Sequence, residues 1–160
     1  MIKINLICVG KIKEKYLLDG IEEYVKRLSK YAKVTIKELD DEKIPSKTSS
    51  SLDEQIKIKE SNKILSLLSK DEYNILLDVY GKEIDSIKLS ETLGKIIDEG
   101  NSVVNFIIAG SLGPSEELRN KVNLKISLSK LTFTHQMTRL ILLEQIYRCF
   151  KINNNETYHK

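Results

Sequence analysis

Two stretches decide the fold: NILLDVY at residues 74–80 and VVNFIIA at residues 103–109. Both are nearly continuous apolar runs of strand length, and Gly81 and Gly110 follow them directly. A strand that is apolar on both sides is buried on both faces, which is typical of a parallel sheet covered by helices. We therefore predict that these runs are central strands of a parallel sheet.

Shorter strands and amphipathic helices alternate with these two runs along the chain. Alternating apolar residues predict strands at 2–9, 33–39 and 124–128. Apolar residues at helical spacing predict helices at 14–31, 52–69 (capped by Ser51 or Asp53), from Ser90 to Gly100, 114–122 and 135–151. The alternation predicts an α/β fold with a parallel-rich sheet and helices on both faces.

Length and charge limit the classes of protein that this chain can be. With 160 residues, 41% of them hydrophobic, the chain is expected to form one domain over 1–160. Its 26 basic and 23 acidic residues give a net charge of +3, too balanced for a histone-like tail or a polybasic arm. Net charge does not exclude a local basic patch.

Cysteine and histidine usage argues against a metal site. Cys8 and Cys149 are far apart in apolar surroundings, and with two histidines in the chain no metal-ligand spacing occurs. We expect both thiols to be buried in a reducing compartment and no metal to be bound. The start of the chain does not have the pattern of a signal peptide, and no apolar run approaches the roughly 18 residues of a membrane span. We therefore expect a cytoplasmic protein with no membrane partner.

The segment AGSLGPS at 109–115 follows the second apolar run, where an open α/β sheet binds its ligands. Its spacing matches neither the P-loop pattern GxxxxGK[ST] nor the dinucleotide pattern GxGxxG, which disfavours a Walker-type NTPase. Two interpretations stay open: the glycines only turn the strand into the next helix, or they also let a ligand approach the backbone closely.

The most unusual stretch is LSKLTFTHQMTRLILLEQIYR at 128–148. A strand ends there, and Thr132 or Thr134 can cap a long helix that is apolar on most sides. Such a helix needs cover on nearly every side, which suggests a partner subunit. The helix dipole lowers the basicity of His135, for which a capping or packing role is favoured over a ligand role.

Charged and aromatic residues interrupt or follow this helix. A charged residue on a covered helix needs a partner, either in a salt bridge across a dimer or in a functional site. The residues concerned are Arg139, Glu144 and Arg148. The polar tail ends in Tyr158 and His159, which either fray or reach a neighbouring site.

Four lysines follow the predicted strands at the same edge of the sheet: Lys11, Lys13, Lys15 and Lys82. Together they could contact nucleic-acid phosphates. No aromatic RNA-recognition motif or helix-turn-helix pattern accompanies them, so any RNA contact would be made by the α/β fold itself.

Several motifs together are similar to those of one known family. They are VGKIKEKY at 9–16, LDVYGK at 77–82, IAGSLG at 108–113, the block at 128–148 and TYHK at 157–160. Over essentially its whole length the chain resembles the ribosomal RNA large-subunit methyltransferase H family, the smallest members of the SPOUT class.

The resemblance implies properties that periodicity does not show. The C-terminal segment would thread through a loop to form a trefoil knot, and the chain would be an obligate homodimer. The activity would be transfer of a methyl group from S-adenosylmethionine (SAM) to N3 of a pseudouridine in 23S rRNA, in the stem-loop that faces the decoding centre. Because the chain has no separate RNA-binding domain, we expect the substrate to be the assembled ribosome.

The resemblance also assigns site residues. The residues that match the family's cofactor-binding positions are Leu77, Ala109, Gly110, Leu128, Ser129, Lys130, Leu131, Thr132 and Phe133. Ala109 stands where the family has a first glycine, which is tolerable if its φ is negative, and Thr134 replaces a common proline. Candidates for removing the N3 proton or stabilising its loss are Arg139, Tyr158 and His159, of which the last two could act from the partner subunit.

Two alternatives come from other classes. A non-catalytic RNA- or nucleotide-binding α/β module would share the glycine turn and the basic edge, but it would not need the apolar last helix or the terminal YHK. A flavodoxin-like nucleotide enzyme would need a phosphate loop after the first strand, where GKIKEKY at 10–16 supplies one glycine.

Overall fold

Five parallel strands form one sheet, and the computed structural model describes them with the rest of residues 1–160. The strand order across the sheet is β2-β1-β4-β3-β5. The bounds are β1 Ile2–Val9, β2 Ala32–Leu39, β3 Tyr73–Glu83, β4 Val103–Ile108 and β5 Leu124–Ser127. The two apolar runs are the neighbours β3 and β4, which confirms the prediction of a parallel sheet with these strands near its centre.

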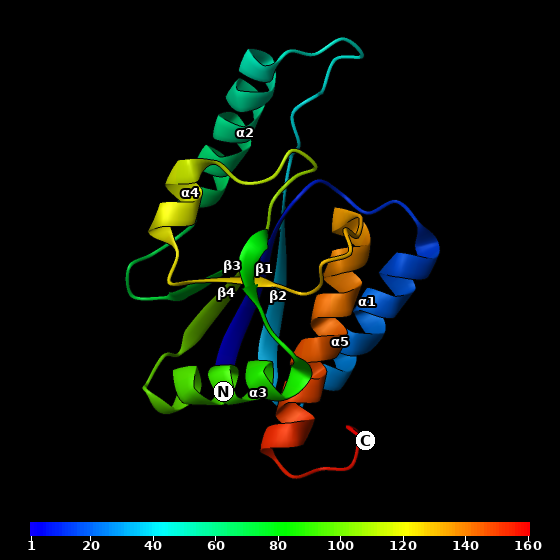
Figure 1. The fold of residues 1–160 in the computed structure, drawn as a ribbon. Coiled ribbons are helices and arrows are strands. Elements are labelled where there is room, and N and C mark those ends of the chain that lie inside the picture. Colours follow the sequence, from blue (N-terminus) through cyan, green and yellow to red (C-terminus); the bar gives the residue numbers. More distant parts are fainter.

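Helices cover both faces of the sheet (Figure 1). The helices are α1 Lys15–Leu28, α2 Ser50–Leu65, α3 Ser86–Asp98, α4 Glu116–Lys121 and α5 His135–Asn153. The larger core of 21 buried residues lies between the sheet and α1, α3 and α5. The smaller core of six residues joins the other face to α2 and α4 through Ile64 and Leu118. Successive buried residues of β1 and of β4 point in turn to the larger and to the smaller core, as expected for strands that are apolar on both faces.

Strand β3 continues past Gly81, where the sequence predicted its end. A Cβ at Gly81 would lie 2.8 Å from the backbone N of Ile126, so β5 passes directly against this glycine. Leu77 and Lys82 both pair with Ile126, and the residues between them bulge out of the ladder. Gly81 therefore ends no strand: it lets the chain return to β5 after the bulge.

Two helices begin earlier than predicted, because other side chains cap them. Ser49 caps α2 by accepting a hydrogen bond from Leu52 N at 3.2 Å, where Ser51 or Asp53 was expected. Asp85 caps α3 by accepting one from Lys88 N at 2.7 Å. Ser90, the expected start of that helix, is buried inside it. Apolar spacing alone did not locate these polar capping residues.

The last helix begins where the sequence predicts. Thr134 caps α5 and accepts a hydrogen bond from Met137 N at 3.2 Å. No residue from His135 to Ile152 is fully exposed, even in the single chain. The end of β5 and the start of α5 thus bring residues 128–138 to the carboxyl edge of the sheet.

Candidate functional site

A cavity of about 710 Å³ lies at the carboxyl ends of β3, β4 and β5. Three segments line it: 77–80 after the middle of β3, 108–114 after β4, and the stretch from Ile126 to Thr138 that joins β5 to α5. Parallel strands bring their carboxyl ends to the same edge, so segments far apart in the sequence form one wall.

Eight of the nine residues predicted to bind a cofactor line this cavity. They are Leu77, Ala109, Gly110, Leu128, Ser129, Leu131, Thr132 and Phe133. Lys130 belongs to the same loop but does not line the cavity. Its side chain is 85% exposed, and its Nζ lies 3.9 Å from Glu83.

Turns within the two loops give the cavity its shape. Gly113 adopts a φ of +87°, a conformation that side chains rarely adopt, and its N–H donates to the carbonyl of Gly110 at 2.9 Å. The hydroxyl of Ser129 accepts a hydrogen bond from Leu131 N at 2.9 Å, which bends the last loop. Ala109 does not have a positive φ, so alanine fits at this position without backbone strain.

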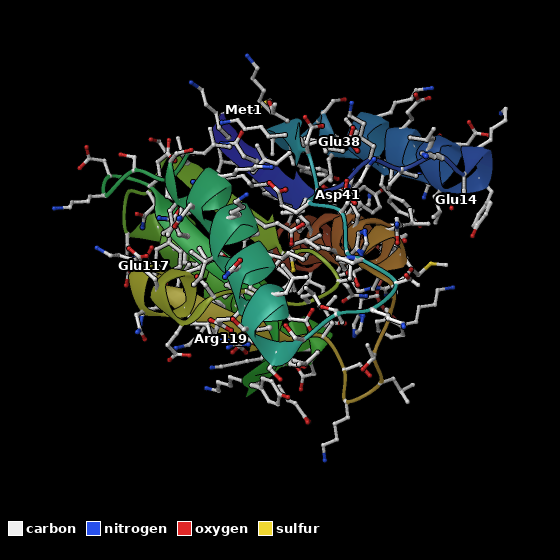
Figure 2. All side chains as sticks on the ribbon, turned by 90° about the horizontal axis from the view of Figure 1, so that it is seen from above. Met1, Glu14, Glu38, Asp41, Glu117 and Arg119 are labelled. Atoms are coloured by element: carbon white, nitrogen blue, oxygen red, sulfur yellow. The ribbon has the colours of Figure 1, made fainter.

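A buried ion pair that sequence reasoning missed fixes the first loop. Arg119 Nε donates to Asp78 Oδ2 at 2.9 Å, and Asp78 Oδ1 accepts a hydrogen bond from Tyr80 N at 3.1 Å. Figure 2 shows Arg119 beside α4, and Arg119 also lines the cavity. An aspartate inside the apolar run LDVY was the available signal, because a buried carboxylate needs a partner.

His135 forms part of the cavity wall at the start of α5. Burial, and then the positive charge of Arg139, lower the pKa of the half-buried His135. The direction agrees with the sequence-based expectation, although the causes are burial and a cation rather than the helix dipole. The imidazole is therefore neutral at physiological pH.

Arg139, a candidate catalytic residue, does not line the cavity. It is 2% exposed, its Nη1 donates to Glu38 Oε2 at 2.6 Å, and its Nη2 donates to the carbonyl of Gly10 at 3.2 Å. Its Nε has no hydrogen-bond partner. In this chain Arg139 ties α5 to β2 and to the end of β1.

The C-terminal tail is ordered and lies at the far end of α5 from the cavity (Figure 1). Tyr158 donates to Glu144 Oε1 at 3.0 Å, and its ring packs edge-on against Tyr147 at 5.0 Å between centroids. His159 Nδ1 lies 3.2 Å from Nη1 of Arg148, which also pairs with Glu144. Glu144 and Arg148 lie in the middle of α5, and no residue after Thr138 lines the cavity. The tail therefore does not meet the cavity of its own chain.

The expected basic edge is partly neutralised. Lys11 Nζ lies 3.8 Å from Asp40, and Lys15 pairs with Asp19 at 2.6 Å. Lys13 and Lys82 have no ion-pair partner. Of the four lysines at the predicted basic edge, these two can therefore bind a phosphate without first breaking an ion pair.

Comparison with known proteins decides the family of this chain. A family model described as "Predicted SPOUT methyltransferase" matches residues 2–159. Proteins named ribosomal RNA large subunit methyltransferase H match over nearly their whole length. That of Clostridioides difficile is 52% identical over 98% of this chain and 99% of its own, and that of Clostridium novyi is 51% identical with the same coverage. The chain belongs to the ribosomal RNA large subunit methyltransferase H family of SPOUT methyltransferases.

A solved structure supports the fold of this SPOUT chain. The tRNA (m1G37) methyltransferase of Aquifex aeolicus superposes with a TM-score of 0.53 at 13% identity, over 91% of this chain and 69% of that one. At this identity the likeness concerns the fold alone. It agrees with the expected SPOUT fold of a parallel sheet between helices.

Other features of this SPOUT chain concern metals and membranes. No group of three or more His, Cys, Asp and Glu side chains is arranged to hold a metal ion. Each helix is too short or too polar to cross a bilayer.

Glu156 anchors the tail of this SPOUT chain to the rest of the molecule. It accepts hydrogen bonds from Lys151 Nζ at 2.8 Å and from the hydroxyl of Tyr31 at 2.9 Å. These donors, Lys151 first, lower the pKa of Glu156 from its ordinary 4.5 to about 2. A carboxylate stabilised in this way contributes above pH 4.5, and its contribution is lost as pH falls toward 2.

We expect Glu156→Gln to loosen the tail at pH 7. The neutral amide loses the charge-assisted bonds that hold residues 156–160. Hydrogen exchange of the tail amides measures this, with circular dichroism to verify that the helices stay folded. Lys95 pairs with Glu99 on the surface of α3, so Glu99→Gln serves as the control and should leave the tail protected. Equal tail protection in Glu156→Gln and wild type would contradict the anchoring role.

Proposed function

We propose that this protein is a homodimeric, cytoplasmic enzyme that uses SAM to methylate N3 of a pseudouridine in 23S rRNA, acting on the assembled ribosome. The observation that carries the proposal is the cavity formed by three loops at the carboxyl edge of the sheet, in a chain that aligns end to end with ribosomal RNA methyltransferases. As part of the proposal, the single domain of residues 1–160 carries the whole activity, and its C-terminal segment is threaded as a trefoil knot.

The cavity has the size and chemistry expected for an adenosine-containing ligand. Sites for cofactors of this size are typically about 300–1,000 Å³ and mainly apolar, with a few polar groups that fix orientation. Leu77, Ile108 and Leu128 supply apolar wall, while turns at Gly110 and Ser129 expose backbone groups. When bound, SAM supplies a methyl group on a positively charged sulfur, which a nucleophilic nitrogen can accept.

The chain must orient the base and remove the N3 proton. Orientation of the two reactants can supply much of the acceleration. Arg139 is engaged with Glu38 and Gly10, so we propose that it positions the start of α5 and the neighbouring His135 rather than touching the base. This leaves the two tail residues as candidates for contact with the reacting base.

We propose that the tail acts on the cavity of the partner subunit. In its own chain the tail reaches back to Glu144 and Arg148 but lines no part of the cavity, which supports a contact made by a second copy. Burial, then hydrogen bonds with Tyr24 and Glu144, raise the pKa of Tyr158. Tyr158 thus stays a hydrogen-bond donor, and the exposed His159 is the better candidate for accepting the proton.

The expected RNA contacts are few. With a net charge of +3 and two unpaired lysines at the basic edge, electrostatic attraction to RNA is weak for a nucleic-acid-binding protein. Specific binding would then depend on the shape of a large partner, which supports the assembled ribosome rather than naked RNA as the substrate.

Mass spectrometry of 23S rRNA tests the function directly. We expect cells that lack this protein to lose one methyl group from a single pseudouridine, and purified protein with SAM to restore it on ribosomes. An unchanged methylation pattern would contradict the proposed reaction. Full activity on a short isolated hairpin would contradict the ribosomal substrate. Calorimetry that finds no binding of SAM or S-adenosylhomocysteine would favour a non-catalytic RNA- or nucleotide-binding module.

A further inference from the structure

A second, smaller compartment adjoins the main cavity. It has a volume of about 160 Å³, and Gly110, Ser111 and His135 line both spaces. Its far side is formed by the 41–44 loop after β2 and by Glu60 of α2. Figure 2 shows Asp41 near α5, on the loop that runs from β2 toward α2. None of the residues that the family resemblance assigns to the cofactor comes from α2 or from this loop.

Glu60 is buried in this wall with one carboxylate oxygen unused. Glu60 is 4% exposed, and its Oε2 accepts a hydrogen bond from Glu42 N at 3.0 Å. Oε1 receives no hydrogen bond from the protein, and it lies 2.6 Å from the position that a Cβ on Gly110 would occupy. A side chain at position 110 would therefore displace the carboxylate of Glu60. Oε1 can therefore accept a hydrogen bond from a ligand in the compartment that Glu60 lines.

Burial raises the pKa of Glu60, and the cations around it do not fully offset this effect. The nearest lysine of α2, Lys63, is engaged with Glu42 at 3.1 Å and with the carbonyl of Asp40 at 2.9 Å. Lys43 lines the compartment, but it is exposed to solvent. Of the three carboxylates that line the compartment, Glu42 is paired with Lys63 and Asp41 is exposed, so Glu60 is the buried carboxylate without an ion-pair partner.

His135 does not balance this charge either. Burial and Arg139 lower the pKa of His135, so the imidazole is neutral where it meets the compartment. The space next to the cofactor cavity is therefore negatively charged, small and open on the side of Gly110 and Ser111. Such a space favours a compact group that is positively charged and donates several hydrogen bonds.

We propose that the compartment binds the α-ammonium group at the amino-acid end of SAM, with Glu60 as its main counter-ion. The inference rests on the proposed use of SAM. SAM carries two positive centres, the sulfonium beside the ribose and the ammonium at the end of a flexible arm, and the carboxylate beside that ammonium can face Lys43, the lysine that lines the same compartment. The arm allows the ammonium to enter a neighbouring space while the nucleoside occupies the larger cavity. Glu60 then receives the partner that its Oε1 lacks.

Calorimetry with three ligands tests the proposal without RNA. The ligands are SAM, S-adenosylhomocysteine, which keeps the ammonium but lacks the sulfonium charge, and methylthioadenosine, which lacks the amino-acid end. In Glu60→Gln we expect the affinity for SAM and S-adenosylhomocysteine to fall about tenfold to a hundredfold, as for a lost charge-assisted hydrogen bond. The affinity for methylthioadenosine should be unchanged. Glu54→Gln makes the same change on an exposed part of α2 and should leave all three affinities unaltered.

Each other outcome has a distinct meaning. An equal loss for all three ligands would mean that Glu60 supports the Gly110 turn, and it would overturn the proposal. A loss for SAM alone would place Glu60 beside the sulfonium and would also overturn it. If wild type binds none of the ligands, the proposed use of SAM fails instead.

A measurement on wild type keeps the test independent of how the variant folds. S-adenosylhomocysteine without its amino group should bind wild type at least about tenfold more weakly than the parent compound. In Glu60→Gln the two compounds should bind alike, because the two changes remove the same contact. Equal binding of both compounds to wild type would overturn the proposal.

Discussion

Removal of Tyr158, His159 and Lys160 is expected to lower methyl transfer by about 10²- to 10⁴-fold, the usual contribution of a positioned acid or base. Binding of SAM should be unchanged, because these residues contact the middle of α5 and none of them lines the cavity. Methylation of ribosomes and calorimetry with SAM measure the two effects. Normal methylation by the shortened chain would leave the tail without a catalytic role.

A mixed dimer separates action within a subunit from action across the dimer. One subunit lacks residues 158–160, and the other keeps its tail but has Leu128→Trp, chosen to fill the cavity and first verified not to bind SAM. If the tail acts across the dimer, this pair regains one complete site and about half of the wild-type activity. If the tail acts within its own subunit, the mixed dimer has no complete site and stays inactive.

Glu38→Ala is expected to lower the free energy of unfolding by about 3 kcal/mol or more, the usual cost of leaving a buried charge unpaired. Glu38 is itself 35% exposed at its side chain, but its loss leaves the buried guanidinium of Arg139 with the carbonyl of Gly10 alone. Arg139→Met should cost less, because the partly exposed carboxylate can then be hydrated. Chemical denaturation measures both changes.

The surface pair of Glu23 and Arg27 on α1 provides the control. Glu23→Ala breaks an exposed pair of the same chemistry and should leave the free energy of unfolding nearly unchanged. Arg139→Met should also raise the pKa of His135, since Arg139 is one of the groups that lower it. Equal destabilisation by Glu38→Ala and Arg139→Met would contradict the asymmetry, and an unchanged His135 titration would remove the link between Arg139 and the cavity wall.

The architecture could be predicted from the sequence because burial leaves a direct pattern. The runs at 74–80 and 103–109 identified a parallel sheet, and the apolar stretch after Thr134 identified the last helix with its cap. The start of α3 was missed, because Asp85 stands apart from the apolar residues whose spacing predicted the helix. The end of β3 was missed because Gly81 was taken as a terminator, whereas it permits close approach of β5.

The candidate site was only partly predictable. The loops that line the cavity follow strand ends, and the resemblance to a family pointed to eight of their residues. The partners that hold the site in place, Glu38 for Arg139 and Arg119 for Asp78, come from distant parts of the chain. No short-range pattern reports such pairs. The far position of the tail also required the folded chain, since sequence alone does not give the direction in which α5 carries it.

The bulge of β3 has a consequence for the thermodynamics of ligand binding. Leu77 and Lys82 pair with the same residue of β5, so the four residues between them form a loop with both ends fixed to one point of the ladder. Asp78 is held as well, by Arg119. This part of the cavity wall has little conformational entropy left to lose when a ligand binds. The heat-capacity change on binding should therefore equal the change expected from the buried surface. The additional change that occurs when a segment folds on binding should be absent.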